Sequence, residues 1–127
     1  MAEDEPLVRK VIRTALERAG YRVLEAGDGS EAVEVFHRHL EQVDLCLLDV
    51  VMPGLNGKEA LEAIRRLDDE VRAIFVTGYA ADVLTARGVE EGGATLVTKP
   101  IAPLDLLRVV RAVLDGVEPV RARRGAV

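Results

Sequence analysis

The feature that most restricts the fold of this chain is a short apolar run, Leu45–Val50, which reads LCLLDV and contains one charged residue, Asp49. A strand with one solvated face alternates apolar and polar residues, whereas a strand covered on both faces is apolar throughout. The run therefore predicts a strand that is buried on both faces. Strands of this kind are typical of parallel sheets, in which the connecting helices cover the two faces.

The rest of the chain alternates between strand-like and helix-like segments. The runs 73–77 (AIFVT) and 95–98 (TLVT) predict two more strands, and 21–26 (YRVLEA) alternates like a short one. Helical spacing of apolar residues predicts helices over about 6–19, 58–67 and 104–114, with a weaker one near 81–87. This alternation predicts an α/β fold with a doubly wound parallel sheet.

Local signals mark the ends of several of these elements. Pro6 suits a first helical turn, and Gly20 suits the position just past the end of that helix. After the turn Gly27-Asp28-Gly29, Ser30 is a candidate cap for one more helix, whose apolar residues are Ala32, Val33, Phe36 and Leu40. The first helix begins so early that only Met1 and Ala2 remain for a strand before the acidic residues. We therefore expect a first strand truncated at the N-terminus, and either a natural protein that extends upstream of Met1 or a chain of reduced stability.

Composition excludes several classes of protein. With 127 residues, 49% of them hydrophobic and 31% charged, the chain has the balance of one globular domain, and we expect it to occupy 1–116, followed by a short, flexible basic tail, 117–127. The net charge of −5 argues against a nucleic-acid partner. No apolar run approaches the roughly 18 residues of a membrane span, so we expect no membrane association and a cytoplasmic location. The single cysteine, Cys46, lies in an apolar run and is expected to pack in the core.

Acidic residues stand where a parallel sheet binds its ligands. Glu3 and Asp4 precede the first helix, and Asp49 lies near the end of its strand. Ligands of open α/β sheets bind beyond the carboxyl ends of the strands, so these carboxylates are expected to converge there. Carboxylates at close range repel one another, and a bound cation offsets that repulsion. A few hard oxygen ligands suit Mg²⁺, which also binds phosphate oxygens.

A hydroxyl and an ammonium group are expected at the same edge of the sheet. Thr77 ends one predicted strand, and Lys99 follows another in a Lys99-Pro100 pair. Phosphoryl transfer requires mainly positioning and neutralisation of charge, which a cation, a hydroxyl and a lysine supply together. Asp49 would then be the nucleophile.

The ordered set of motifs resembles the bacterial response-regulator receiver family, with a sequence style closest to the C-terminal receivers of hybrid histidine kinases. The motifs are Glu3-Asp4-Glu5-Pro6, Asp49 in LLDVVMPGLNG, Thr77-Gly78 and Lys99-Pro100. The resemblance implies a five-stranded parallel sheet of order 2-1-3-4-5, similar to the chemotaxis response regulator. That fold is a known example of ligand binding where the strand order reverses.

The resemblance also assigns roles to the site residues. It implies that Asp49 accepts a phosphoryl group from a histidine kinase or a histidine phosphotransfer protein, and that the changed state is read by a downstream output protein. Mg²⁺ would be held by Glu3, Asp4, Asp49 and the backbone carbonyl of Val51. Thr77 and Lys99 would each contact a phosphoryl oxygen. On this view the chain is a signalling module that assists its own phosphorylation and is not an enzyme acting on other substrates.

The chain departs from the family pattern in the residue three before Lys99. That residue is often aromatic and reorients on activation, whereas here it is Leu96, so output would run through backbone shifts or charge.

Two other functions remain open from the sequence. An aspartate-nucleophile phosphatase usually has a second Asp two residues after the nucleophile, and Val51 stands there instead. A pseudo-receiver would bind partners without phosphorylation; intact Asp49, Thr77 and Lys99 argue against it, whereas the short first strand leaves it open. Taken singly, Glu3 and Asp4 would equally suit the N-terminus of a helix, where negative charge is stabilised.

Overall fold

The computed structural model describes residues 1–52, 54–77, 95–98 and 102–116. Its elements in chain order are α1 (Pro6–Arg18), α2 (Gly29–Arg38), β1 (Leu45–Asp49), α3 (Gly57–Leu67), β2 (Arg72–Thr77), β3 (Thr95–Thr98) and α5 (Pro103–Leu114). The strands predicted over 45–50, 73–77 and 95–98 are confirmed, as are the helices predicted over 6–19, 58–67 and 104–114. The helix expected near 81–87 lies outside the described residues.

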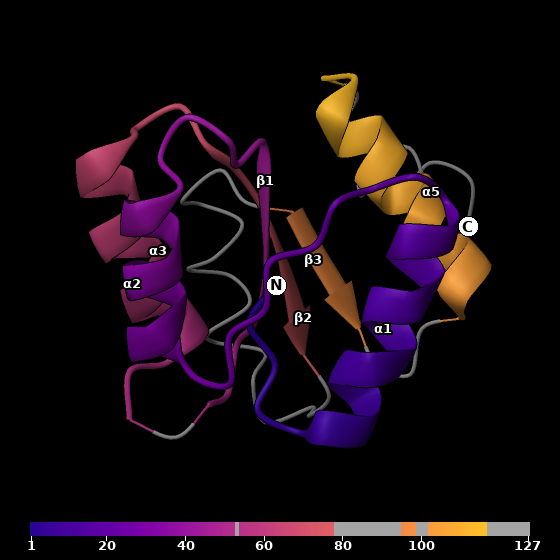
Figure 1. The fold of residues 1–127 in the computed structure, drawn as a ribbon, viewed down its shortest axis with the longest axis horizontal. Helices are drawn as coiled ribbons and strands as arrows, with labels where there is room; N and C mark the ends of the chain where they lie inside the picture. The colour runs from indigo at the N-terminus through magenta and orange to yellow at the C-terminus, as the bar shows by residue number, and fades with distance from the viewer. Residues whose placement is uncertain (53, 78–94, 99–101, 117–127) are drawn as a thin grey trace.

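The strands β1, β2 and β3 form one parallel sheet in that order. Helices α2 and α3 lie on one face of the sheet, and α1 and α5 lie on the other (Figure 1). The two neighbours Ile74 and Phe75 on β2 are 0% and 1% exposed and pack into separate apolar clusters, one on each face. Burial on both faces is why β1 and β2 are mainly apolar rather than alternating.

The helix boundaries follow from capping and from close packing. Pro6 is the first residue of α1, and Gly20 just beyond its end has a φ of 96°, which glycine adopts without strain. The expected cap of α2 was wrong: Asp28, not Ser30, accepts a hydrogen bond from the backbone N–H of Glu31 at 2.8 Å. The helix thus begins one residue before Ser30, and it ends at Arg38, so that Leu40 lies beyond it.

The prediction of a strand over 21–26 was also wrong. Of those residues only Ala26 forms a β-bridge, a single parallel one to Ala2, which also bridges to Leu48 on its other side. Ala2 donates to the carbonyl of Leu47 at 2.8 Å and accepts from the backbone N–H of Asp49 at 3.0 Å. A strand needs a partner along its length. The segment that lies in space between 21–26 and β1 has only two residues, Met1 and Ala2, before the acidic residues begin. Alternation of apolar and polar residues is therefore not enough to form a strand over 21–26.

A cavity of about 220 Å³ lies beside Met1 and Ala2, between 21–26 and β1. Its lining is largely apolar and includes Tyr21, Val23, Leu45, Phe36 and Leu114. The α-amino group of Met1 donates to the carbonyl of Leu24 at 2.8 Å, and burial lowers the pKa of this amino group below its usual range. Cys46 also lines the cavity; it is buried, as predicted, and burial raises the pKa of its thiol to about 11.

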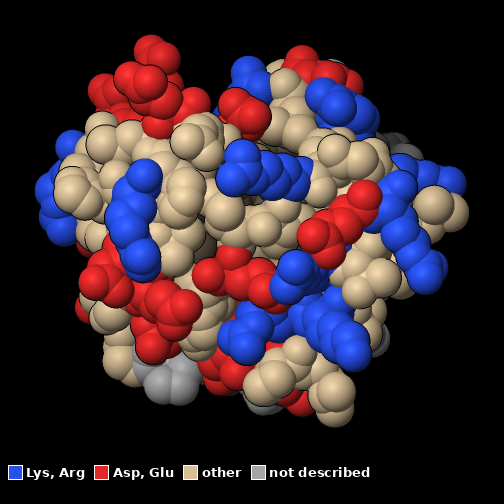
Figure 2. Space-filling view, viewed as in Figure 1, with Lys and Arg blue, Asp and Glu red and all other residues tan. Residues whose placement is uncertain are grey.

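On the face shown in Figure 2, Lys and Arg side chains lie among Asp and Glu side chains. In the part of the chain that the structure describes, no helix is both long and apolar enough to cross a membrane.

Candidate functional site

The carboxyl end of β1 positions Asp49, which is 6% exposed although it carries a carboxylate. Its backbone N–H donates to the carbonyl of Ala2 at 3.0 Å. One side-chain oxygen, Oδ1, accepts the backbone N–H of Val51 at 3.2 Å. The side chain is therefore held at the point where the chain leaves the sheet.

The short segment between Ala2 and α1 positions the other two acidic residues. Glu3 donates through its backbone N–H to the carbonyl of Ala26 at 3.1 Å, and its carboxylate accepts the N–H of Glu5 at 3.2 Å. Glu3 is 2% exposed, whereas the next residue, Asp4, is exposed. Because α1 begins at Pro6, only Glu5 separates Glu3 and Asp4 from the helix.

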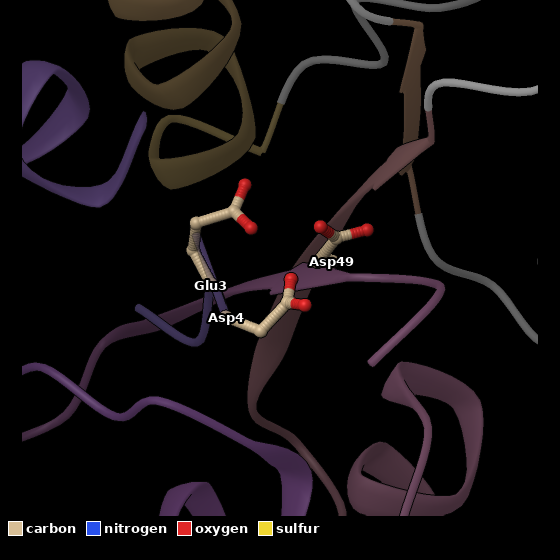
Figure 3. A group of neighbouring side chains, drawn as sticks. All are labelled: Glu3, Asp4 and Asp49. Atoms are coloured by element: carbon tan, nitrogen blue, oxygen red, sulfur yellow. The ribbon is translucent and has the colours of Figure 1, made fainter. Parts of the chain in front are cut away.

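The three side chains Glu3, Asp4 and Asp49 converge, as the sequence predicted. One carboxylate oxygen from each lies within 4.8 Å of those of the other two, and the side chains surround a common space (Figure 3). Like charges at this range repel, the more so because Glu3 and Asp49 are shielded from water. A cation among them would reverse the sign of that interaction, and carboxylate oxygens are the ligands that Mg²⁺ prefers. The donor set therefore fits a magnesium ion.

Thr77 lies beside this cluster at the same edge of the sheet. It is the last residue of β2 and is 5% exposed, and its strand neighbour Val76 is in register with Asp49. Val50 donates to the carbonyl of Val76 at 3.0 Å, which continues the pairing past the end of β1. The register thus places Thr77 one residue beyond Asp49 on the adjacent strand. Lys99 follows the last residue of β3 in sequence and lies outside the described residues.

Sequence reasoning missed the part that Gly57 plays in supporting the site. A Cβ atom on Gly57 would lie 2.2 Å from the carbonyl oxygen of Asp49, which leaves no room for a side chain. The backbone N–H of Gly57 donates to the carbonyl of Val50 at 3.1 Å. The start of α3 therefore packs directly against the backbone of the acidic residue. The only signal in the sequence was a second glycine in PGLNG, which reads equally well as a loop residue.

Comparison with known families is consistent with this geometry. The family model described as "Response regulator receiver domain" matches residues 1–111. A probable transcriptional regulator, ycf27, of Guillardia theta is 40% identical over 116 residues, which are 90% of this chain and 44% of that protein. The sensor kinase CckA of Brucella abortus is 33% identical over 91% of this chain and 12% of its own length. The chain spans about half the length, or less, of these curated relatives.

Solved structures share the fold. A receiver domain protein from Clostridium thermocellum superposes with a TM-score of 0.84, covering 90% of each chain at 26% identity. The CheX–CheY complex of Borrelia burgdorferi, crystallised with BeF3 and Mg, has a TM-score of 0.81 at 25% identity and covers 88% of this chain and 84% of that one.

Proposed function

Because the chain belongs to the family of response regulator receiver domains of two-component signalling, we propose that Asp49 is its phosphoacceptor. The observation that carries the proposal is the convergence of Glu3, Asp4 and Asp49 at the carboxyl edge of a parallel sheet. Of the three, Asp49 is the one that ends a strand of the sheet, and its side chain accepts the N–H of Val51. Its carboxylate is thus both fixed and close to two others.

In the proposed reaction, a carboxylate oxygen of Asp49 attacks the phosphorus atom of a donor. A new oxygen–phosphorus bond forms to give an acyl phosphate. The bond from phosphorus to the donor's leaving nitrogen or oxygen breaks, and the leaving group keeps the electron pair. The buried setting of Asp49 favours this step because electrostatic interactions with the developing charge are stronger where water is excluded.

Mg²⁺ would be held by the carboxylates of Glu3, Asp4 and Asp49, with the backbone carbonyl of Val51 as a further ligand. When bound, it neutralises charge on the transferring phosphoryl group. Glu3 and Asp4 would hold it from the segment before α1, and Asp49 would hold it from the end of β1. Thr77 would donate its hydroxyl to one phosphoryl oxygen, and Lys99 would neutralise another. The place of Thr77 at the end of the strand beside Asp49 supports its role.

The proposal extends to the fold and its limits. We propose that the sheet has the family order 2-1-3-4-5. In that order, 21–26 would take the second place in the chain, the segment around Ala2 the first, and β1 the third, so that the segment around Ala2 would lie between the other two. The bridges from Ala2 to Ala26 and to Leu48 support that order, and so does the run from β1 through β2 to β3. The receiver would occupy 1–116, with 117–127 as a tail. Because Leu96 stands three residues before Lys99, where the family often has an aromatic residue, signal output from the phosphorylated state would depend on backbone shifts or charge.

The donor would be the phosphohistidine of a histidine kinase or a phosphotransfer protein, and the product would be read by an output protein or domain. The relatives support both arrangements, since they include transcriptional regulators and a sensor kinase. The proposal makes the chain a signalling module in place of a phosphatase, because no second Asp stands at position 51. The same carboxylate cluster favours it over a phosphorylation-independent receiver.

Incubation with acetyl phosphate tests the proposal. We expect a mass gain of one phosphoryl group, detected by intact-mass spectrometry, only when Mg²⁺ is present. The Asp49→Asn variant keeps the shape of the side chain but removes the nucleophile, and we expect no gain. Asp4→Asn should slow labelling and raise the Mg²⁺ concentration that it requires, because one of the three carboxylates is lost.

Exposed carboxylates elsewhere on the surface provide the matched control. Asp69→Asn, on the exposed turn after α3, should label like the unchanged protein. A mass gain that survives Asp49→Asn would show that another residue is the acceptor. No gain with acetyl phosphate in the presence of Mg²⁺ would favour the phosphorylation-independent receiver.

A further inference from the structure

Arg9 connects the acidic segment to a second segment of the chain. Its guanidinium nitrogen Nη1 donates to the backbone carbonyl of Glu3 at 3.0 Å, while its backbone N–H donates to the carbonyl of Glu5 at 2.9 Å. One residue of α1 thus holds both ends of the stretch that contains Asp4. The side chain of Arg9 is 27% exposed, so water competes only in part for these bonds.

The same guanidinium is confined on its other side by 25–27. Its Nε lies 3.9 Å from a carboxylate oxygen of Glu25, and a Cβ atom on Gly27 would lie 3.0 Å from Nη1. The absence of a side chain at Gly27 therefore leaves the space that Arg9 occupies. The backbone N–H of Glu3 is bonded to Ala26 in this same segment, so the guanidinium closes a short loop of contacts around Glu3.

From these contacts we infer that Arg9 is a positioning residue for the cation site, acting through the backbone of Glu3 without touching the cation. This inference rests on the proposed magnesium site. Glu3 and Asp4 lie on a turn with little regular structure, and only Ala2 pairs with the sheet before it. The hydrogen bond from Arg9 fixes the carbonyl of Glu3 before the cation binds. Less conformational entropy of the turn would therefore be lost on binding. Partners behind metal ligands characteristically raise affinity in this way.

Positioning and simple electrostatics predict opposite effects of Arg9 on Mg²⁺ affinity. A positive charge near three carboxylates repels Mg²⁺, so removing the charge of Arg9 should tighten binding if charge alone mattered. If positioning dominates, removing Arg9 should weaken binding. The sign of the change in Mg²⁺ affinity therefore separates the two roles.

The test is a Mg²⁺ titration of the full chain followed by amide NMR chemical shifts, which requires no phosphorylation. We expect Arg9→Gln to raise the half-saturating Mg²⁺ concentration by about tenfold, and Arg9→Lys by less, because lysine keeps a donor but not the planar fork. Gly27→Ala perturbs the guanidinium from the other side and should shift affinity in the same direction. With acetyl phosphate, the labelling rate of Arg9→Gln should recover at saturating Mg²⁺.

Arg13 supplies the matched control one turn further along α1. Its Nη1 binds Glu25 at 2.7 Å and its Nε binds Glu17 at 3.0 Å, so Arg13→Gln removes a charge and a contact to the same segment. Arg13→Gln should leave the Mg²⁺ affinity within about twofold. Unchanged or tighter binding in Arg9→Gln, while the unchanged protein binds Mg²⁺, would overturn the inference. Absence of Mg²⁺ binding in the unchanged protein would overturn the proposed metal site with it.

Discussion

At the scale of single residues, the site depends on carboxylates that the fold holds together against their repulsion. Glu3 and Asp49 are both nearly buried, and burial of an ionised carboxylate costs free energy unless hydrogen bonds or a cation compensate. Backbone N–H groups from Glu5 and Val51 supply part of that compensation. The chemistry is thus concentrated in a few side chains, whereas their placement depends on the backbone around them.

Gly57 gives a test of that backbone placement. We expect Gly57→Ala to lower the free energy of unfolding by about 1–3 kcal/mol, because the new methyl group would overlap the carbonyl of Asp49. The displaced strand end should also slow labelling of Asp49 by acetyl phosphate. Denaturant unfolding and intact-mass kinetics measure the two effects. Lys58→Ala, at the next and exposed position of α3, should change stability by no more than about 0.5 kcal/mol; equal effects of the two substitutions would contradict the explanation.

At the scale of elements, the helices are specified more completely than the N-terminal side of the sheet. In α3, Asn56 and Glu59 form a reciprocal capping box, and Leu61 and Ile64 are buried. Near Ala2, by contrast, one residue bridges to both sides, and the cavity of about 220 Å³ lies beside it. A helix makes its backbone hydrogen bonds within its own segment, whereas a strand needs a partner along its whole length.

The cavity predicts that an extended apolar segment placed before Met1 would stabilise the protein. Adding Val-Leu-Val-Val there should fill apolar space and replace a buried ammonium, whose pKa burial has lowered, by a peptide N–H. Burying two such side chains contributes about 1.5–3 kcal/mol each, so the melting temperature should rise by roughly 5 °C or more. Calorimetry against a Gly-Ser-Gly-Ser extension of equal length gives the comparison. Equal melting temperatures for the two extensions would show that the cavity accepts no strand.

At the scale of the whole molecule, the proposed cation site joins parts that are distant in sequence. Glu3 and Asp4 belong to the short segment before α1, and Asp49 is the last residue of β1. Binding at such a site favours the folded state, because the unfolded chain does not hold these carboxylates together. Stability should therefore report on the site independently of any reaction.

We expect Mg²⁺ to raise the melting temperature in a saturable way. At about tenfold its dissociation constant, a ligand adds about 1.4 kcal/mol of stability, which for a domain of this size is a few degrees. Excess chelator should abolish the rise, and NaCl of matched ionic strength should not reproduce it. The rise should be smaller in Asp4→Asn. An equal rise in Asp4→Asn and the unchanged protein would place the stabilising cation elsewhere.

The sequence by itself determined most of the elements and the convergence of the three acidic residues. Leu45–Val50 and the run 73–77 predicted buried parallel strands because burial on both faces excludes polar residues, and the run 95–98 predicted a further strand. The position of Asp49 at a strand end predicted convergence with Glu3 and Asp4, because the carboxyl ends of parallel strands share one edge. The resemblance to receiver domains rested on these same residues, and membership of that family is confirmed.

Tertiary structure alone decided what depends on neighbours in space. Local alternation favoured a strand over 21–26, but the facing segment is so short that a single bridge forms, between Ala2 and Ala26. Ser30 was as good a cap as Asp28 by residue type; close packing of Gly29 against the backbone of Leu55 accompanies the start of the helix there. The contacts of Gly57 with Asp49 and of Arg9 with Glu3 join segments whose approach no local pattern encodes. Strand pairing and close backbone contact are properties of two segments together, and a sequence read along one chain specifies each segment separately.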